Sequence, residues 1–494
     1  MRTKKISIVI PKEVNLVLEE LIKAGFEAYA VGGCVRDSIK GIKPRDWDIA
    51  TNARPDQIAK LFPKSFQDND FGMVTILTDS DDKTLKEIQI MPYRAESTYS
   101  DKRHPDKISW VKTIEQDLAR RDFTVNALAL AETKGKTKII DPFGGQKDLV
   151  KEIIRAVGNP EERFAEDALR MMRAARFAVT LGKNWKIELK TEKTIKKNAA
   201  DLKLISQERI RDEFLKIIMS DRASQGVELL RTLGLLAFIT PELEEGFKVS
   251  QNKHHIYDCY EHNLRSLAYA TEKNYNQNVR LAALFHDVGK PRTKRGEGDN
   301  ATFYSHEIVG AKMARQILRR LRFGNKDIDK VVKLVRYHLF YYDVEEVTES
   351  SVRRLLRNAG VENIEELLQV RYCDRIGSGC PKAEPYKLRH LKYVMEKVSQ
   401  DPITVTNLAI GGEEIMNILK IQPGPKIGRI LDILFAEVLE EPKKNNKAYL
   451  QERVEELGKL KERVLADLAG KAKNEREEVI MKRDEMTKKK YWVS

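Results

Sequence analysis

Hydrophobic and polar residues follow two different patterns along the chain, and the change between them falls near residue 160. In the first 150 residues, FGMVTILTD (71–79) and LKEIQIMPY (85–93) are apolar runs of strand length, separated by the turn-forming segment TDSDD. The segment DPFGGQKDL (141–149) has turn chemistry and marks a boundary. Beyond Asn159-Pro160, apolar residues recur with the period of a helix. The pattern therefore predicts an α+β protein, with strands and helices mixed in an N-terminal head and helices in the remainder.

The C-terminal segment predicts a long helix. From Leu450, apolar residues recur at Val454, Leu457, Leu460, Val464 and Leu468, with charged residues between them. This spacing places them on one stripe of a single amphipathic helix. The segment that follows, NEREEVIMKRDEMTKKKYWVS, is so highly charged that we expect either a solvated helix or a frayed tail.

The net charge of the chain points to a polyanionic partner. Its 494 residues include 89 Lys and Arg against 75 Asp and Glu, so the formal charge is +14. Nucleic acid is the commonest polyanion that such an excess binds, although a generally basic surface would give the same count. No apolar run approaches the roughly 18–20 residues that cross a membrane, and the apolar core of MRTKKISIVIPKEV is too short for a signal peptide. We therefore expect no membrane partner.

The spacing of the cysteines indicates the cellular compartment of the protein. Cys34, Cys259, Cys373 and Cys380 are scattered and show neither a disulfide framework nor a zinc-like spacing. The nearest pair, Cys373 and Cys380, has six residues between its members, which indicates neither kind of site. A cytoplasmic location, where thiols stay reduced, fits best.

Residues 30–51, AVGGCVRDSIKGIKPRDWDIAT, contain two features that suit a nucleoside triphosphate. Gly32 and Gly33 follow an apolar run and precede a plausible helix, so their backbone N–H groups could approach a phosphate. Asp46 and Asp48 lie two apart on a strand-like stretch, where alternate residues share a face. Two converging carboxylates repel each other unless a cation lies between them, and hard oxygen ligands beside phosphate favour Mg²⁺. The alternative, a turn-capping Asp beside a surface Asp, requires no metal.

The order of several motifs carries a stronger signal. The segments are GGCVRD (32–37), DWD (46–48), RRDFTVNALA (120–129), DPFGGQKDL (141–149), EDALRMMRAARFA (166–178) and ERIRDEF (208–214). In this order they resemble the successive motifs of the bacterial-type (class II) tRNA nucleotidyltransferase and poly(A) polymerase family. The resemblance implies a polymerase-beta-like nucleotidyltransferase head with a mixed sheet over residues 1–150. It also implies an all-helical neck over 151–250, an HD-containing body over 251–400 and a helical, tRNA-contacting tail over 401–494.

The same resemblance assigns roles to side chains in the head. Asp46 and Asp48 would be catalytic and would hold two Mg²⁺ ions, which activate the attacking hydroxyl and stabilise the leaving pyrophosphate. The other nucleotide-binding residues are Gly32, Gly33, Arg36 and Arg121 for the triphosphate, and Arg120, Asp122 and Asn126 for the sugar or for bracing the site. A purely structural role for Asn126 is an equal alternative. Family members usually carry a carboxylate at the position of Gln89, and Glu87 lies on the same strand face, so support of the metals by either residue is left open.

Four charged residues follow one another at intervals of three, namely Asp167, Arg170, Arg173 and Arg176. This spacing puts them along one broad flank of a helix, which in isolation indicates a solvated face. The resemblance implies instead that Asp167 and Arg170 read the Watson–Crick edge of the incoming base, selecting C and A against U and G without a template. Arg173 and Arg176 would face phosphate or brace Asp167.

A second set of candidate ligands lies between residues 262 and 374. They are His262 (EHNL), His286 and Asp287 (LFHDVGKP), His306 (YSHEIVG), His338 (VRYHL) and Asp374 (YCDRIG). The set resembles the metal site of HD-superfamily phosphohydrolases, and imidazole with carboxylate suits a divalent transition metal that activates water. A lone histidine is more often a packed residue, but the eight histidines of the chain concentrate in this region. Hydrolysis of 2′,3′-cyclic or terminal phosphates, or of pyrophosphate-like nucleotides, is left open.

Within the family, the sequence favours a CCA-adding enzyme, which transfers CMP and AMP from CTP and ATP to the 3′ end of tRNA. Enzymes that add only CC resemble the rest but have a shortened loop where this chain has YRAESTYSDKRHPDKISW (93–110). The intact loop argues against CC-only addition and leaves A-only addition open. Poly(A) polymerases of the family generally lack the HD motifs and rank third. Two alternatives of other classes are an HD phosphohydrolase with a nucleotide-sensing head and a non-enzymatic RNA-binding protein.

Overall fold

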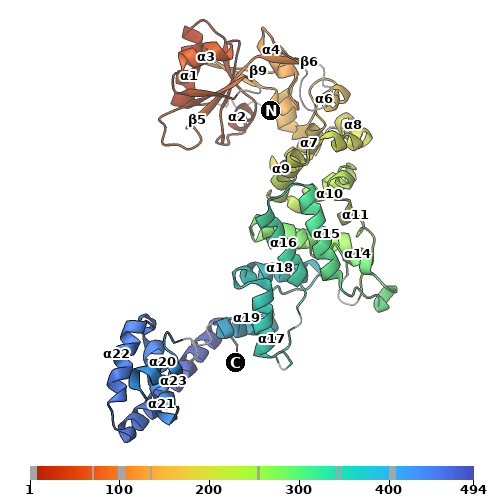
Figure 1. Cartoon of the computed structure of the whole chain (residues 1–494). Helices are drawn as coiled ribbons and strands as arrows, with labels where there is room; N and C mark the ends of the chain where they lie inside the picture. The colour runs from red at the N-terminus through yellow and green to blue at the C-terminus, as the bar shows by residue number, and fades with distance from the viewer. Residues whose placement is uncertain are drawn as a thin grey trace. The chain divides into compact units, whose positions relative to one another are not determined.

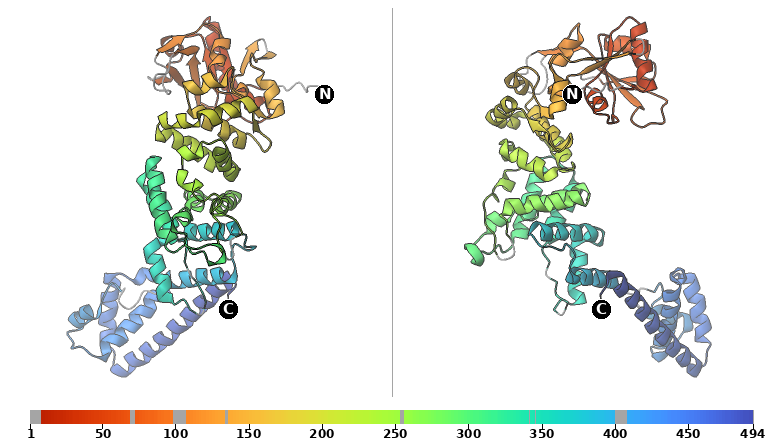
Figure 2. Two further views of the ribbon diagram at one scale, coloured as in Figure 1. Left: turned by 90° about the vertical axis from the view of Figure 1, so that its right-hand side faces the viewer. Right: turned by 180° about the vertical axis from the view of Figure 1, so that it is seen from behind.

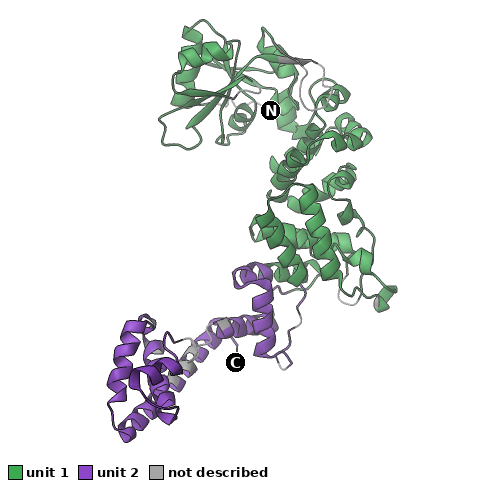
Figure 3. Ribbon diagram, viewed as in Figure 1, with its two compact units in different colours: residues 1–338, 369–381 green, residues 339–368, 382–494 purple. Residues whose placement is uncertain are grey.

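The computed structural model describes residues 8–493 except 69–71, 98–106, 134–135, 253–255, 341, 345 and 400–407 (Figure 1). The chain forms two compact units (Figure 3). Unit 1 comprises residues 1–338 and 369–381, and unit 2 comprises residues 339–368 and 382–494. The expected HD body over 251–400 includes residues of both units, since 339–368 and 382–400 belong to unit 2, and the four-part division stays a prediction.

The head of unit 1 is built on one seven-stranded sheet. Its strands, in spatial order, are β3 (Ser65–Asp68), β4 (Met73–Leu77), β5 (Glu87–Pro92), β2 (Asp48–Thr51), β1 (Ala28–Val31), β8 (Ala129–Thr133) and β9 (Lys136–Ile140). The pairing of β2 with β5 is parallel and every other pairing is antiparallel, so the sheet is mixed, as predicted. Val74 pairs with Ile90 across β4 and β5, which confirms the two neighbouring strands expected from residues 71–93.

Helices and a hairpin surround this sheet. They are α1 (Lys12–Lys23), α2 (Gly33–Ile39), α3 (Pro55–Leu61), α4 (Ile114–Ala119), η1 (Thr124–Asn126), α5 (Gly145–Lys151) and the hairpin of β6 (Arg94–Ser97) with β7 (Lys107–Trp110). Ile114 and Leu118 of α4 pack against Val31 and Ala129 of the central strands, and this contact forms part of the head core. The centre of the polar loop expected over 93–110 lies outside the described residues, so the structure does not test its role.

After the head, the chain is almost entirely helical, as Figure 2 shows from two sides. The first group of helices is α6 (Pro160–Glu166), α7 (Leu169–Thr180), α8 (Leu189–Asn198), η2 (Ala199–Leu204), α9 (Gln207–Ile218), α10 (Ala223–Thr232), η3 (Leu236–Phe238) and α11 (Pro241–Glu244). One exception to the predicted helical pattern is a short parallel pair, β10 (Ile153–Ile154) with β11 (Lys186–Ile187). Two-residue strands carry too little periodicity to be recognised from sequence.

The next helices of unit 1 surround a second core. They are α12 (Cys259–Glu272), α13 (Gln277–Phe285), α14 (Lys290–Thr293), η4 (Gly298–Asn300), α15 (His306–Arg320), α16 (Asn325–Tyr337) and the unit 1 part of α18 (Ile364–Gly377). The buried guanidinium of Arg280 on α13 donates to the carbonyls of Ile218, at 3.0 Å, and Ser220, at 3.1 Å. These hydrogen bonds offset the cost of burying a charged group and join the end of α9 to α13.

Unit 2 contains the remaining helices. They are α17 (Glu349–Ala359), η5 (Val361–Asn363), α19 (Tyr386–Ser399), α20 (Gly412–Leu419), α21 (Pro425–Glu440), η7 (Pro442–Lys444), α22 (Lys447–Gly458) and α23 (Glu462–Tyr491). Residues Ile430, Leu434, Val454 and Leu465 belong to its apolar core.

The single amphipathic helix predicted from Leu450 is wrong, because the chain turns between α22 and α23. Leu460 N–H donates to Leu457 O across this turn, so the helical register starts again at residue 462. As a result Leu465 is buried, whereas Val464 is 45% exposed and Leu468 is 37% exposed. Within the described residues, no helix combines the length and the apolar character that crossing a bilayer requires.

Candidate functional site

The turn between β1 and α2 requires glycine at residue 32. Gly32 has a φ of +80°, a conformation that residues with a side chain rarely adopt. A Cβ at this position would lie 2.8 Å from Nη1 of Arg121. Gly33 follows at the start of α2, where a Cβ would lie 3.7 Å from Nη2 of Arg36. The two glycines therefore bring bare backbone against two of the arginines that the resemblance assigns to the triphosphate.

The paired carboxylates lie beside this turn, but only one belongs to a strand. Asp48 begins β2, paired with Val31 on β1 and with Gln89 on β5. Asp46 precedes the strand in a bend, which corrects the expectation that both residues lie on one strand. Burial and the neighbouring charge of Asp46 raise the pKa of Asp48 to about 6, while Arg121 opposes the shift. Two neighbouring carboxylates repel each other when both are ionised. A divalent cation bound between them would remove this repulsion, so the pair fits a metal site.

The strand register identifies the neighbour of Asp48 on β5. Gln89 is directly paired with Asp48 in the parallel ladder, so the two side chains share a face. Glu87 lies two residues away, pairs with Leu77 and is exposed. The residue beside the carboxylate pair is thus an amide, whose oxygen could ligate a metal without adding negative charge.

Asp117 organises two of the predicted arginines, and the sequence reasoning did not include it. This residue of α4 is buried, and its Oδ1 accepts from Nη2 of Arg120 at 2.8 Å. Its Oδ2 accepts from Nη2 of Arg121 at 3.1 Å. Burial would raise the pKa of Asp117, but the two arginines outweigh it and lower the pKa. The segment DLARR could have indicated this residue. Its Asp lies three residues before the first Arg and four before the second, a spacing at which helical side chains are neighbours.

A continuous set of hydrogen bonds joins further predicted residues from three elements. Nη1 of Arg36 donates to Oδ1 of Asn126 at 2.7 Å. Nδ2 of Asn126 donates to Oδ1 of Asp122 at 3.2 Å. Oδ2 of Asp122 pairs with Nη2 of Arg173 on α7 at 2.6 Å. Burial alone would raise the pKa of Asp122, but Arg173 and then Arg170 lower it.

Asp167 lies between two helices, which corrects the prediction that it shares one helix with the three arginines. Helix α6 ends at Glu166, and Asp167 has an extended conformation with φ −148° and ψ 104°. Its Oδ1 accepts from the backbone N–H of Leu169 at 3.0 Å, in the first turn of α7. The short polar side chain thus satisfies the backbone at a helix start, which favours a break over a continuous helix.

The partners of this group also differ from those expected. Asp167 is braced by Arg209 of α9, whose Nη2 donates to Oδ2 at 2.7 Å, and not by Arg173. Arg170 pairs with Glu166 at 2.8 Å, and Arg176 pairs with buried Glu213 of α9 at 2.6 Å. Arg209 and Glu213 both belong to the motif ERIRDEF, so the motif was visible but the contacts of its members were not.

The six predicted HD ligands converge in the second core of unit 1. The groups of side chains that could hold an ion are His262, His286, Asp287 and Asp374, and also Asp287, His306 and His338. Every member is buried. The distances from Asp287 Oδ2 are 3.0 Å to Nε2 of His262 and 3.3 Å to Nε2 of His286. Its Oδ1 lies 3.2 Å from Nε2 of His306 and 3.5 Å from Nε2 of His338. Asp287 therefore lies between the two groups, with one oxygen toward each.

The histidine rings are oriented as metal ligands. Nδ1 lies 2.9 Å from the Ala283 carbonyl in His286 and 2.7 Å from the Val335 carbonyl in His338. A proton on Nδ1 makes these hydrogen bonds and leaves the Nε2 lone pair free. Nε2 of His262 and Nε2 of His286 are 2.8 Å apart, so a shared proton or cation must separate them. Four imidazoles and two carboxylates fit divalent transition metals.

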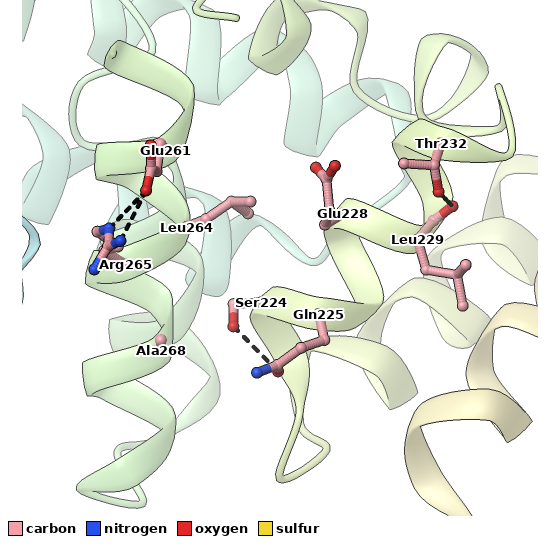
Figure 4. Close-up of a pocket in the computed structure, with 9 residues that line it drawn as sticks. All are labelled: Ser224, Gln225, Glu228, Leu229, Thr232, Glu261, Leu264, Arg265 and Ala268. Carbon is pink, nitrogen blue, oxygen red and sulfur yellow. Dashed lines mark hydrogen bonds and ion pairs between the residues drawn. The ribbon is translucent and has the colours of Figure 1, made fainter. Parts of the chain in front are cut away.

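A separate hollow of about 420 Å³ lies between α10 and α12 (Figure 4). It is lined by Ser224, Gln225, Glu228, Leu229, Thr232, Glu261, Leu264, Arg265 and Ala268. Glu228 is held by Arg231 at 2.7 Å and by the Tyr260 hydroxyl at 3.0 Å. None of its lining residues belongs to either group described above, so this hollow is not part of the candidate sites.

Three family models match successive parts of the chain, and the two candidate sites lie in different matches. Residues 28–155 match the family described as "Poly A polymerase head domain", and residues 259–378 match "HD domain". Between them, residues 184–247 match "Probable RNA and SrmB- binding site of polymerase A". The head match contains every predicted residue from Gly32 to Asn126, and the HD match contains all six candidate ligands.

Whole-chain relatives extend the match. The CCA-adding enzyme of Enterococcus faecalis is 32% identical over 454 residues, which cover 89% of this chain and 94% of the relative. The A-adding tRNA nucleotidyltransferase of Deinococcus radiodurans is 32% identical over 431 residues, covering 82% of this chain and 90% of the relative. The crystal structure of the Bacillus stearothermophilus CCA-adding enzyme in complex with CTP is 28% identical with a TM-score of 0.60, covering 91% of this chain and 98% of that chain. The family resemblance seen in the sequence is thereby confirmed, and the chain belongs to the tRNA nucleotidyltransferase and poly(A) polymerase family.

Proposed function

We propose that this protein is a CCA-adding enzyme, which transfers CMP and AMP from CTP and ATP to the 3′ end of tRNA and releases pyrophosphate. One observation carries the proposal. Arg121 acts on the charge of Asp48 and lies against Gly32, whose carbonyl accepts from the backbone N–H of Arg36 at 3.1 Å; side-chain hydrogen bonds then continue from Arg36 through Asn126 and Asp122 to Arg173. The surroundings of Asp48 and helix α7 are thus joined through the glycine turn and a set of charged and polar side chains, which supports a single nucleotide bound across them.

Each part of this set has a chemical task in the proposed reaction. Arg121 and Arg36 present guanidinium groups beside bare glycine backbone, an arrangement that suits the oxygens of a triphosphate. Mg²⁺ held by Asp46 and Asp48 would supply activation of the 3′-hydroxyl and neutralisation of the leaving pyrophosphate. Asp167 and Arg170 provide an acceptor and donors for the edge of a base, and the bond from Arg209 fixes the direction of the Asp167 carboxylate. Positioning and charge stabilisation are the main demands of phosphoryl transfer.

We also propose how the protein recognises tRNA. The excess of basic residues suits contacts with tRNA phosphates, and we assign residues 401–494 to a tail that contacts tRNA. Residues 1–150, 151–250 and 251–400 would act as head, neck and HD body. The four cysteines are free thiols, which agrees with a cytoplasmic enzyme.

The experiment uses tRNA transcripts that end before CCA, after C and after CC. With labelled CTP and ATP, we expect the purified protein to extend all three to a complete CCA end. Extension of the last transcript alone, with AMP, would identify an A-adding enzyme like the Deinococcus radiodurans relative. Continued addition of AMP would identify a poly(A) polymerase. Failure to extend any transcript would contradict transfer altogether.

A second activity is favoured by the cluster around Asp287. We propose that the HD centre binds one or two divalent transition metal ions, with Asp287 shared between the two groups of ligands. A metal held there would activate water for hydrolysis of 2′,3′-cyclic or terminal phosphates. The test is release of phosphate from a 2′,3′-cyclic nucleotide after loading with Mn²⁺, Ni²⁺ or Co²⁺. Metal binding without hydrolysis would reduce the centre to a structural site.

A further inference from the structure

The head contains a pocket that belongs to neither of the candidate sites. Its volume is about 360 Å³, and its lining residues include Asn52, Arg54, Tyr93, Trp110 and Lys112. These residues lie at or just after the last residues of three strands, β2, β5 and β7. The pairing of β2 with β5 is parallel, and the carboxyl ends of parallel strands are a common place for ligands.

This pocket is separate from the nucleotide site around Asp48. Asp48 is the first residue of β2, whereas Asn52 and Arg54 follow its last residue, Thr51. At about 3.3 Å per residue, the two ends of this strand are about 10 Å apart. No residue assigned to the transferred nucleotide or to the HD centre lines the pocket. A ligand bound in it is therefore not the nucleotide that is being transferred.

One wall of the pocket is an aromatic ring that is held at its edge. Gly72 has a φ of +69°, and a Cβ at this position would lie 2.8 Å from Cη2 of Trp110 and 3.2 Å from Cγ of Pro55. The bare backbone of Gly72 thus leaves room for the edge of the indole beside Pro55. Trp110 is nevertheless 43% exposed. An indole that is fixed on one side and exposed on the other suits stacking with a planar ring.

The polar groups of the pocket are mostly unused donors. Arg54 and Lys112 are exposed and form no ion pair with a carboxylate in the described part of the chain. Oδ1 of Asn52 accepts from the backbone N–H of Glu27 at 2.8 Å, and its Nδ2 has no hydrogen bond among the described residues. The hydroxyl of Tyr93 donates to Oε2 of Glu27 at 3.2 Å. Two cations and one amide N–H₂ are therefore available to an anionic ligand.

These features together select the class of ligand. Guanidinium and ammonium groups suit phosphate oxygens, and an exposed indole stacks on a base. The volume lies in the range of about 300–1,000 Å³ that small-molecule sites occupy, which suits one nucleotide. A simple anion would use the two cations and leave Trp110 without a task.

We propose that this pocket is a second nucleotide site of the head, which binds the base and phosphate of a nucleotide other than the one transferred. That nucleotide is either free in solution or one residue of an RNA chain, and the chemistry of recognition is the same for both. The inference goes beyond the proposed function and does not depend on which transfer reaction the head performs.

The test counts the nucleotides that the full chain binds. The parent and R54Q/K112Q are titrated with ATP and Mg²⁺ in a calorimeter, without RNA. We expect two ATP molecules per parent chain. In the variant, the Kd of one of them should rise about 10- to 100-fold, because charge-assisted hydrogen bonds are lost. K12Q/K83Q removes two exposed lysines of the head outside the pocket, with the same change in net charge, and should bind both.

Two further measurements assign the weakened site to the pocket. Trp110→Ala should raise the same Kd by a factor on the order of ten, and Trp110→Phe, which keeps an aromatic ring, should raise it less. CMP incorporation by R54Q/K112Q should stay within about twofold of the parent, which would establish an intact site around Asp48.

Competition identifies the source of the nucleotide. If a saturating RNA minihelix displaces the second ATP, the pocket holds a residue of the RNA chain; if both bind together, it holds a free nucleotide. One ATP per parent chain, or two that survive in R54Q/K112Q, would overturn the proposal. Inorganic phosphate that displaces this ATP as well as AMP does would also overturn it, since the base would then contribute nothing. If the parent holds the second ATP yet extends no tRNA transcript, the proposed function fails and the pocket stands.

Discussion

The two charged sites of unit 1 surround their buried carboxylates with different groups. In the head, buried Asp117 and Asp122 are each neutralised by arginines, whereas Asp46, which is exposed, and partly buried Asp48 have no ion pair within the described residues. In the HD centre, Asp287 lies 3.0 to 3.5 Å from the Nε2 atoms of four imidazoles and also pairs with Nζ of buried Lys290 at 2.6 Å, and Asp374 pairs with Arg371 at 2.5 Å. The head therefore surrounds its carboxylates with guanidinium groups, which suit an anionic substrate, whereas the HD centre adds imidazoles, which suit a cation.

The way each site is assembled differs as well. The head site combines a turn, strand ends and short helices, so its arginines can approach a ligand that enters and leaves. Three HD ligands lie on α12, α15 and α18, the other three directly follow the ends of α13 and α16, and all six are buried. A site whose ligands are all buried suits a resident ion more than an exchanging nucleotide.

The largest expected effect is loss of transfer in Asp46→Ala. Removing one of the two carboxylates takes away a ligand of the cation, so we expect a loss of several kcal/mol of transition-state stabilisation. This loss corresponds to at least about a 1,000-fold fall in the rate of CMP incorporation. The measurement is incorporation into a tRNA transcript that lacks CCA, with circular dichroism to verify folding. HD hydrolysis should be retained. Normal incorporation by this variant would reject the metal assignment in the head.

The converse change is His286→Ala. We expect it to abolish binding of the HD metal and hydrolysis of a 2′,3′-cyclic nucleotide, and to leave CMP incorporation within about twofold of the parent. Metal content is measured by mass spectrometry of the protein after loading and desalting. His390→Ala, which changes a histidine of unit 2 outside the cluster, is the matched control and should keep the metal. Retention of metal by His286→Ala would remove this residue from the centre.

Many residues of the two sites could be predicted from the sequence because they lie in short segments. The glycine turn, the paired aspartates and the HD dipeptide are each short segments whose spacing survives any fold. The strands at 71–93 alternate strongly enough for the period to show, whereas the pairing of Gln89 with Asp48 became visible only in the structure. Six widely separated ligands of the HD centre were found because the motif fixes their residue types, not because the sequence shows them to be close.

What the sequence could not show are contacts between distant segments and breaks in helical periodicity. Arg209 reaches Asp167 across 42 positions, and no local pattern links the two. The break at Asp167 was missed since a spacing of three residues is compatible with one helix, although Asp also caps helices.

Asp117→Asn tests whether the head depends on the neutralising pairs. Without this charge, Arg121 loses its buried partner and is free to turn toward Asp48. The loss of one charge-assisted hydrogen bond predicts an increase of about tenfold in KM for CTP, with a smaller fall in kcat. Steady-state kinetics at saturating tRNA provide the measurement. Asp117→Glu keeps the charge and should recover part of the affinity, whereas equal KM values for all three proteins would assign Asp117 a structural role.

Variants of the proposed base-reading residues should discriminate less between CTP and UTP, with a smaller effect than the changes above. In Asp167→Ala, and similarly in Arg170→Ala, we expect discrimination against UTP to fall about tenfold, since one hydrogen-bonding group to the base edge is lost. Arg209→Ala should act in the same direction but less, because Arg209 works through Asp167. Arg211→Ala changes another arginine of α9, which pairs with Asp212, and is the control. The measurement is the ratio of kcat/KM for CTP and UTP, and an unchanged ratio in Asp167→Ala would contradict base reading by this residue.

The smallest expected effect concerns stability and its dependence on pH. Because Arg173 and Arg170 outweigh burial and lower the pKa of Asp122, the ionised carboxylate stabilises the folded head above the unfolded pKa, near 4. This contribution is lost as the pH falls further, toward the folded pKa. Asp122→Asn should therefore lower the free energy of unfolding by about 1–3 kcal/mol at pH 7, and the difference from the parent should shrink below about pH 4. Urea unfolding of both proteins at pH 7, 5 and 3.5 measures it. A difference that stays constant over this range would mean that the hydrogen bonds of Asp122, and not its charge, support the head.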